Sequence, residues 1–404
     1  MRKNAVNRQL NVLQGGVCAV AGFTANTVRC GLDSTYPHHD VGLILSDKKC
    51  AVAFLGNATP MAGAPVKVSR RHTKSGLAKG VLFNTGIANV YGEQSERLSK
   101  LMCWEVAKRL RIDATDFIVA STGNMDKTFT LEQFASCVPT LLADMDFVEE
   151  KDFALATTLD PKHPKQLAFS FELGDFVCKI GAVFKGNRRV APNLATTLCF
   201  ITTDVNISPE MLQKALQTVA NDTFNQLSID CISSPNDCVC VLANGKAGNY
   251  KITVEDTEYT KFLHALSDTI DKICKRLVAN PEDNEQAFLC KIKGARSKKL
   301  ARDLSKAMVQ AVGIKERLSY GELDLQDVVA VLAQNGEKIE WNGLCVQISS
   351  DKGSVALVEE NKRFPFGWDT IKNIVFGEDF CIEITLGQGN YSAVAYGRKR
   401  KANA

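Results

Sequence analysis

Apolar and polar positions along the chain follow two different periods, and these predict strands and helices in the same molecule. Short runs of β-branched, aromatic and aliphatic residues predict strands at 41–45, 51–55, 117–121, 176–184, 198–205, 237–245, 287–294, 355–358, 380–386 and 391–397. Apolar stripes at helical spacing predict helices within 208–220, 261–278 and 297–308. Ser208 is a candidate N-cap for the first of these helices, with Pro209 at its first helical position. The pattern predicts an α/β or α+β fold, and it leaves open which strands pair.

Length and charge narrow the class of protein. A chain of 404 residues is longer than one compact core usually holds, so two domains or lobes are expected. Its 49 basic and 45 acidic residues nearly balance, which argues against nucleic acid as the main partner. No run of about 18 apolar residues occurs, at the N-terminus or elsewhere. We therefore expect no membrane partner and a soluble, cytoplasmic protein.

The cysteines do not suggest a metal site. There are 14 of them, scattered along the chain, and no two stand in a C-x-x-C pair. Most lie within apolar runs, where cysteine packs as a small hydrophobic residue in a reducing compartment. The glycines in "GQG" at 387–389 lack the strand–turn–helix context of a phosphate loop. No metal and no bound cofactor is predicted.

One short segment carries candidate chemistry. In "PNLATT" the small residue Ala195 precedes Thr196 and Thr197, between a turn-forming "APN" and the apolar run "LCFI". A threonine hydroxyl needs a nearby base to act as a nucleophile, and cleavage before Thr196 would supply one in the freed α-amino group. Such an amine titrates at a pKa of about 7.7–8.0. The alternative is structural: a β-branched pair that opens a strand after an ordinary turn.

Segments along most of the chain resemble one enzyme family. "KGNRRVAPNLATTLCFITTD" resembles the self-cleavage segment of the ornithine acetyltransferases. Further matches follow in the family's order: "GFTANTVRCGL", "DVGLILSDKKCAVAFLGN", "VLFNTGIANVYGEQ", "ASTGNMD", "LATTLDPK", "PEDNEQAFLCKIKGA" and "TLGQGNYSAVAYG". They cover residues 20–397 approximately. The resemblance implies the two-lobed, self-processing N-terminal-nucleophile fold of that family.

The resemblance also implies a processed enzyme. Cleavage between Ala195 and Thr196 would give an α chain, 1–195, and a β chain, 196–404, with 281–404 as a C-terminal subdomain. Thr196 would then be the nucleophile that takes an acetyl group from N-acetylornithine and passes it to glutamate, a ping-pong step of arginine biosynthesis. Acetyl-CoA is a possible second donor. Two α and two β chains are expected to form a heterotetramer.

Site residues follow from the same matches, position by position. Thr122 and Gly123 correspond to the family's oxyanion-hole pair. Lys185 and Glu282 correspond to substrate contacts, for which a lysine suits a carboxylate and a glutamate an amino group. Thr157 corresponds to a substrate threonine, although the spacing allows Thr158 instead. Considered singly, Thr122 and Gly123 are more typical of a plain turn, and Lys185 and Glu282 are more typical of solvated surface charges.

The chain also departs from the family pattern. It has "GNRR" at 186–189 in place of a glycine-rich GSGM, "DCISSPND" at 230–237 in place of DGDTSTND, and "GELDLQD" at 321–327 in place of NDPNWGR. The family's last substrate contacts have no counterpart after Gly397, so altered substrate recognition is expected. Two alternatives therefore stay open: the same machinery acting on another acylated amine, and a non-catalytic paralogue. The basic run 398–401 is either a solvated terminus or a binding arm for such a paralogue.

Overall fold

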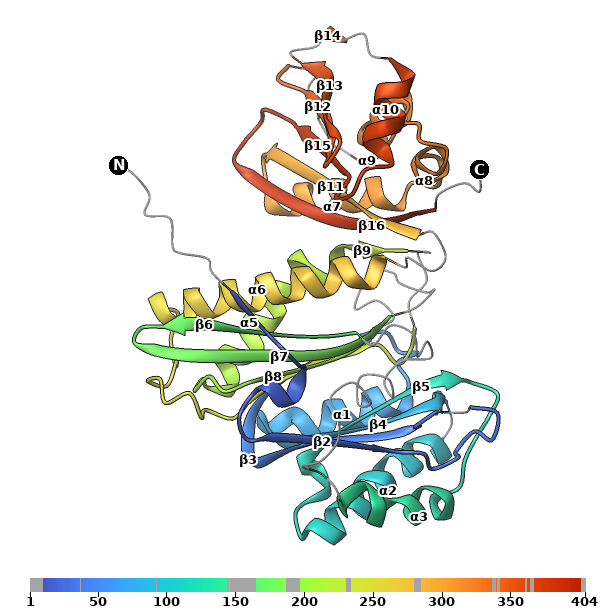
Figure 1. The fold of residues 1–404 in the computed structure, drawn as a ribbon, viewed down its shortest axis with the longest axis vertical. Helices are drawn as coiled ribbons and strands as arrows, with labels where there is room; N and C mark the ends of the chain where they lie inside the picture. Colours follow the sequence, from blue (N-terminus) through green and yellow to red (C-terminus); the bar gives the residue numbers. More distant parts are fainter. Residues whose placement is uncertain are drawn as a thin grey trace. The chain divides into compact units, whose positions relative to one another are not determined.

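The computed structural model describes residues 10–36, 38–91, 93–143, 145, 165–186, 197–229, 234–279, 285–335, 339, 342–359, 362–363 and 367–400. These residues form two compact units (Figure 1). The first contains the described residues up to 186 together with 197–219 and 234–269. The second contains 220–229 and the described residues from 270 onward. Each unit is built around its own sheet.

Nine strands form the sheet of the first unit within the described residues, in the order β1-β6-β7-β8-β10-β3-β4-β5 with β2 paired to β3. Their bounds are β1 Asn11–Leu13, β2 Phe23–Val28, β3 Val41–Gly56, β4 Leu77–Ile87, β5 Phe117–Asn124, β6 Gln166–Leu173, β7 Phe176–Gly186, β8 Thr197–Thr203 and β10 Cys238–Ala243. The pairs β4–β5 and β8–β10 are parallel, whereas β7–β8, β10–β3 and β3–β4 are antiparallel. This mixed sheet brings the ends of β5, β7 and β10 to the site described below.

Helices cover the sheet of the first unit on separate faces. They are α1 Ala64–His72, α2 Glu93–Leu110, α3 Leu131–Ala143, α5 Pro209–Asp222 and α6 Thr257–Val278, with the last two continuing into the second unit. In Figure 1, α2 and α3 lie together beside β2 to β5. Phe262 of α6 packs on Phe171 of β6, with 6.5 Å between the ring centroids. Short 3-10 turns at Val17–Ala19, Thr73–Ser75 and Ala114–Asp116 link these elements.

Within the described residues of the second unit, seven strands form a sheet in the order β14-β13-β12-β15-β11-β16-β9. Its strands are β9 Leu227–Ser228, β11 Glu285–Ala295, β12 Cys345–Ser350, β13 Gly353–Glu359, β14 Lys362–Arg363, β15 Cys381–Thr385 and β16 Tyr391–Arg400. Its helices are α7 Lys298–Gln310, α8 Val312–Ser319, α9 Leu325–Asn335 and α10 Trp368–Val375, besides a 3-10 turn at Phe224–Gln226. Helix α7 packs against β11 and β16, and α10 against β12, so one apolar core joins helices and sheet.

The predicted mixture of strands and helices is confirmed, and the predicted cap at Ser208 forms. Ser208 Oγ accepts a hydrogen bond from the Met211 amide at 3.3 Å. Ser297, which was not predicted as a cap, caps α7 by accepting a hydrogen bond from the Leu300 amide. The separate strands predicted at 41–45 and 51–55 are instead one strand, β3. Residues 47–49 between them are exposed, and the register with β4 shifts between Leu45 and Cys50. A bulge therefore absorbs the polar "SDKK", and the strand continues past it.

The basic run near the C-terminus was interpreted wrongly as a solvated tail or arm over residues 398–400. These residues form the end of β16. The side chains of Arg398 and Lys399 are only 7% and 1% exposed. Arg398 Nη1 lies 2.6 Å from Glu285 Oε2, and Lys399 Nζ lies 4.6 Å from the ring centre of Phe380. Strand pairing with β11 buries the two charges and gives them partners.

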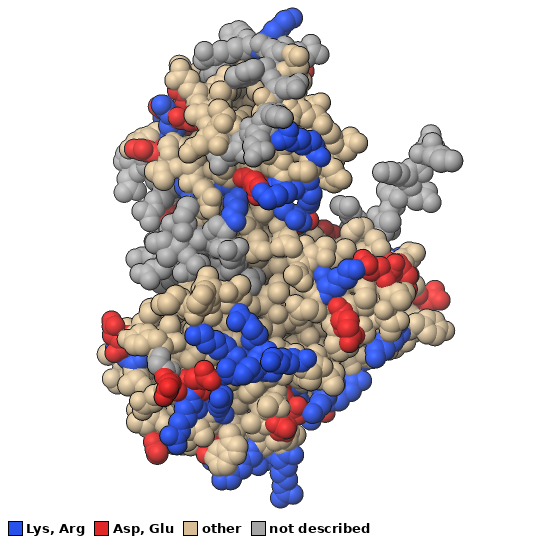
Figure 2. Space-filling view, turned by 180° about the vertical axis from the view of Figure 1, so that it is seen from behind, with Lys and Arg blue, Asp and Glu red and all other residues tan. Residues whose placement is uncertain are grey.

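Surface charge follows the composition. In the view of Figure 2, positive and negative side chains lie close to one another on the described surface, as near-equal numbers of the two lead one to expect. Arg71 and Lys100, for example, both pair with Glu96. No helix in the described ranges combines the length and the apolar composition needed to cross a membrane.

The predicted α and β chains, 1–195 and 196–404, are defined by a cleavage site and not by the compact units of the fold. They stay a prediction, as does the 281–404 subdomain.

Candidate active site

The candidate site lies where three neighbouring strands of the first unit meet at one end. At the open end of the β7–β8 pair, Gly186 stands opposite Thr197 and Lys185 opposite Leu198. Leu198 also pairs with Cys238, the first residue of the parallel strand β10, and Asp237 is the residue before Cys238. Lys185, Asp237 and the start of β8 are therefore brought to one end of the sheet.

The predicted oxyanion pair lies at the end of β5. Thr122 and Gly123 are paired with Thr85 and Gly86 of the parallel strand β4. Gly123 has φ +139°, and a Cβ placed on it would lie 2.1 Å from the carbonyl carbon of Gly86. Only glycine fits this close approach of two backbones. The turn after Thr122 is thereby fixed by local backbone geometry.

Lys185 reaches across from β7 to this turn. Its Nζ donates a hydrogen bond to Thr122 Oγ1, and its side chain is buried at 7% exposure. Three of the residues predicted from the sequence, Thr122, Gly123 and Lys185, thus come together although they are up to 63 residues apart in the chain. A buried ammonium beside a hydroxyl is a suitable environment for a carboxylate or a developing oxyanion.

Burial also changes the protonation of this lysine. Removal from water disfavours the charged form and lowers the pKa of Lys185 from 10.5 to about 7, while the nearby Asp237 carboxylate acts in the opposite direction. The ammonium and the neutral amine are therefore both populated close to neutral pH. Asp237 is itself 2% exposed and accepts a hydrogen bond from the Ser234 amide at 2.9 Å. Its position is fixed by the turn that precedes β10.

We predict that Lys185 titrates near pH 7 in the folded protein. Carbon-13 NMR of the lysine Cε atoms should show a resonance with that midpoint, lost in Lys185→Met and kept in the control Lys299→Met at an exposed site. Because the folded-state pKa of Lys185 lies below the ordinary lysine value of 10.5, the unfolded chain binds this proton more tightly between pH 7 and 10.5. Unfolding free energy should therefore rise with pH across that window and lose this contribution as pH falls through 7. A Lys185 resonance that titrates above pH 9 would contradict the prediction.

Buried amides hold the strand ends behind Thr122. Asn236 Nδ2 donates to the carbonyls of Ala88 and Ser121, the latter at 3.0 Å. Ser121 Oγ donates to Asn84 Oδ1 at 2.6 Å, and Asn84 Nδ2 donates to the Ile87 carbonyl at 2.8 Å. Sequence reasoning missed both asparagines. The available signal was the turn sequence "SPND" directly before an apolar strand.

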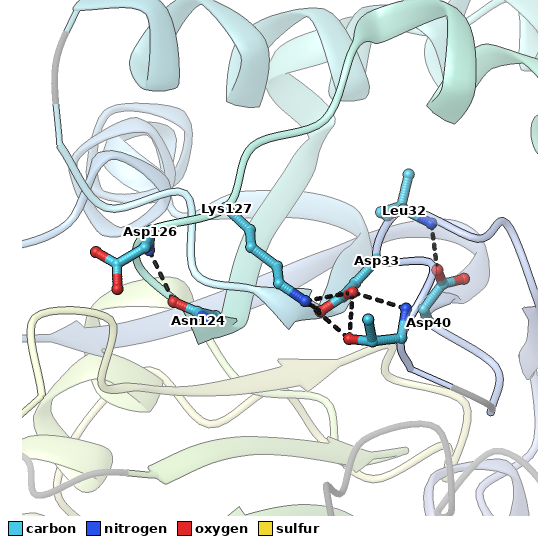
Figure 3. A network of polar contacts seen from close by, with 7 residues as sticks. Leu32, Asp33, Asp40, Asn124, Asp126 and Lys127 are labelled. Atoms are coloured by element: carbon cyan, nitrogen blue, oxygen red, sulfur yellow. Dashed lines mark hydrogen bonds and ion pairs between the residues drawn. The ribbon is translucent and has the colours of Figure 1, made fainter.

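A second network braces the loop after β5 (Figure 3). Lys127 Nζ lies 2.7 and 2.8 Å from the two carboxylate oxygens of Asp33 and 2.7 Å from Thr35 Oγ1. The hydrogen bond from Lys127, aided by one from Thr35, lowers the pKa of Asp33 to about 2. A Cβ placed on Gly86, the glycine that faces Gly123, would lie 3.2 Å from the Cβ of Asp33. The loop that follows the predicted oxyanion pair is therefore tied to the loop after β2.

The remaining predicted site residues lie outside the described residues. These are Ala195 and Thr196 of the predicted cleavage bond, Thr157 with its alternative Thr158, and Glu282. Their roles stay predictions. Among the residues that the structure does describe, no group of three or more His, Cys, Asp and Glu side chains could hold a metal ion.

The chain matches a known family over nearly its whole length. Residues 24–399 match the ArgJ family. The arginine biosynthesis bifunctional protein ArgJ of Staphylococcus epidermidis is 28% identical over 390 residues, covering 96% of each chain. The glutamate N-acetyltransferase of Methanothermobacter thermautotrophicus is 27% identical over 398 residues, covering 96% of this chain and 95% of that relative. The crystal structure of arginine biosynthesis bifunctional protein ArgJ from Bacillus halodurans is 23% identical, with a TM-score of 0.46, and covers 50% of this chain and 92% of its own.

Fold and site together define a mixed α/β protein with a buried lysine, a hydroxyl and a paired-glycine turn at one end of its larger sheet. The family match covers most of the sequence, so the chain belongs to the ArgJ family. The predicted membership of the ornithine acetyltransferase family is confirmed.

Proposed function

We propose that the protein is a glutamate N-acetyltransferase of arginine biosynthesis that moves an acetyl group from N-acetylornithine to glutamate. The observation that carries the proposal is the Lys185–Thr122 hydrogen bond beside the start of β8, in a chain matched to the ArgJ family over residues 24–399. The names of its relatives, a bifunctional arginine biosynthesis protein and a glutamate N-acetyltransferase, support the reaction class. The substrates would be small amino acids and their acetyl derivatives.

Self-cleavage would prepare the nucleophile. The Thr196 hydroxyl attacks the Ala195 carbonyl carbon, the peptide bond breaks, and the Thr196 nitrogen takes a proton to become a free amine. Water then hydrolyses the resulting ester, which leaves a carboxylate on Ala195 and restores the Thr196 hydroxyl. The new α-amino group lies within reach of that hydroxyl and can accept its proton in the later transfer steps.

Acetyl transfer would proceed in two halves at the same residue. The Thr196 oxygen attacks the acetyl carbonyl of N-acetylornithine, and ornithine leaves as the amine after taking a proton. The amine of glutamate then attacks the acetyl-threonine ester and regenerates the hydroxyl. In both halves the Thr122 hydroxyl and the Gly123 amide would donate to the tetrahedral oxyanion. Lys185 would bind a substrate carboxylate, with Thr157 and Glu282 as further substrate contacts.

We extend the proposal to partners as the family resemblance implies. Two α and two β chains would associate after cleavage, and no cofactor would be required. Acetyl-CoA would act as a second acetyl donor and not as a bound group. The same machinery acting on another acylated amine is the second candidate, because "GELDLQD" at 321–327 replaces the family's NDPNWGR segment.

The test is a transfer assay on the purified protein. With N-acetylornithine and glutamate we expect N-acetylglutamate and ornithine in equal amounts, and parallel lines in double-reciprocal plots as each substrate is varied. An assay with acetyl-CoA in place of N-acetylornithine tests whether acetyl-CoA is a second acetyl donor. A panel of other N-acetylated amino acids serves as the comparison. Transfer to glutamate only from one of those donors would favour the second candidate, and no transfer from any donor would contradict both.

A further inference from the structure

We propose that Asn236 is a positioning residue of the acyl-transfer site, holding the Thr122–Gly123 turn in place through two backbone carbonyls. The inference rests on the proposed function, because it assigns Asn236 to the same site. The residue lies in the turn before β10, within the segment 230–237, and the sequence assigned it no role. Its side chain is 5% exposed.

The contacts of Asn236 converge on the predicted oxyanion turn. Its Nδ2 donates to Ser121 O at 3.0 Å, one residue before Thr122, and also to Ala88 O. Ala88 N in turn donates to Asn124 O at 2.8 Å, one residue after Gly123. The β4–β5 ladder ends at the Ile87–Asn124 pair, so the asparagine amide links the two strands just where their own pairing stops. Both sides of Thr122–Gly123 are thereby fixed.

The turn that carries Asn236 is itself anchored. Gly63 N donates to Pro235 O at 2.8 Å, and Asn57 N donates to Asp237 O at 2.9 Å. Asn57 Nδ2 donates to Ser234 O at 2.9 Å. A Cβ on Gly63 would lie 1.9 Å from Asn236 Oδ1, so the backbone at Gly63, the residue before α1, lies directly against the amide. The side chain of Asn236 therefore has a rigid support and little room for another shape.

The donors at this position come from the amide nitrogen, whereas Asn236 Oδ1 is buried with no hydrogen-bond partner among the described residues. Two carbonyl oxygens need N–H donors, and an asparagine NH₂ offers two. An aspartate has nearly the same shape but, when ionised, accepts hydrogen bonds only, and it would place a negative charge against both carbonyls. The adjacent Asp237 is the carboxylate that acts on the Lys185 ammonium. One turn thus places both the hydroxyl of Thr122 and the charge that balances Lys185.

The experiment compares Asn236→Asp with Asn244→Asp. Asn244 is a matched control because it follows the other end of β10, is 4% exposed, and also donates its Nδ2 to a carbonyl, that of Ala21 at 2.8 Å. We expect Asn236→Asp to lower kcat about 10²-fold with KM nearly unchanged, as misplacement of a catalytic turn does. Asn244→Asp should leave kcat within about twofold of the parent value. Equal loss of kcat in the two variants would overturn the proposal.

A double substitution separates positioning from a general effect on folding. If Asn236 acts through Thr122, then Asn236→Asp should cost little further activity in a Thr122→Ala background. The same fold-loss in both backgrounds would show that the two residues act independently, against the proposal. Should Asn236→Asp not fold, Asn236→Ser keeps one donor and should lower kcat by a smaller factor with KM again unchanged; an unchanged kcat there would count against the assignment.

Hydrogen exchange provides a readout that does not depend on acetyl transfer. Asn236→Asp should speed amide exchange in 87–89 and 121–124, and Asn244→Asp should not. If the parent protein transfers acetyl from no donor and Asn236→Asp still speeds exchange there, the proposed function fails and the structural role of Asn236 stands. Unchanged exchange in an active protein would mean that the proposed function stands and the inference about Asn236 fails.

Discussion

Purified Thr196→Ala protein should remain one uncut chain of 404 residues, whereas the parent protein should give two chains of about half that length on a denaturing gel. Cleavage needs a hydroxyl next to the Ala195 carbonyl, and alanine supplies none. N-terminal sequencing of the C-terminal chain from the parent should read Thr-Thr-Leu-Cys. This substitution should also abolish acetyl transfer, because both the nucleophile and its amine base are lost.

Thr197→Ala is the matched control for this prediction. It removes the neighbouring hydroxyl at the first residue of β8 and keeps Thr196, so two chains should still form. The C-terminal chain should then begin Thr-Ala-Leu-Cys. Cleavage of the Thr196→Ala protein, or a C-terminal chain that begins elsewhere, would refute the assignment of Thr196.

Thr122→Ala should slow acetyl transfer by about 10²-fold or more, with folding intact, because one donor to the developing oxyanion is removed. The loss should appear in kcat, since the donor acts mainly on the transition state. The residue is only partly buried and lies two residues before the end of β5, so its truncation leaves no core cavity. Steady-state kinetics with N-acetylornithine and glutamate measure the effect.

Two further variants define what the result means. Thr122→Ser keeps the hydroxyl and should recover most of the rate. Thr218→Ala removes a threonine whose hydroxyl bonds only within α5, to Lys214 O at 2.8 Å, and should leave the rate within about twofold of the parent value. A Thr122→Ala rate as high as that of Thr218→Ala would reduce Thr122 to a turn residue.

Local elements of this fold could be predicted from the sequence, because the interactions that define them are local. The strands predicted at 176–184 and 198–205 are observed at 176–186 and 197–203, and the cap at Ser208 forms as expected. The burial of Arg398 could not be predicted in this way. It depends on Glu285 of β11, which lies more than 100 residues earlier and meets Arg398 only when the strands pair.

The candidate site shows the same difference between local features, which the sequence predicts, and long-range contacts, which it does not. Composition and spacing alone left Thr122 and Lys185 as a turn residue and a surface charge, and only the family resemblance selected them. Their hydrogen bond joins the ends of β5 and β7, which are not adjacent in the sheet order. Asn236 lies within the segment 230–237 that the resemblance covered, but it was given no role, because its partners are backbone carbonyls and carry no side-chain signature.

The burial of Arg398 and Lys399 at the end of β16 limits which truncations and fusions the C-terminus tolerates. The Glu285 side chain is 3% exposed and pairs with Arg398. Trimming by an exopeptidase would remove this cation if it reached Arg398, and so would a truncation made to aid crystallisation. Breaking a buried ion pair in this way costs about 3–5 kcal/mol, a large share of the stability of an ordinary domain. An affinity tag is therefore better attached beyond residue 400 than substituted for the final strand.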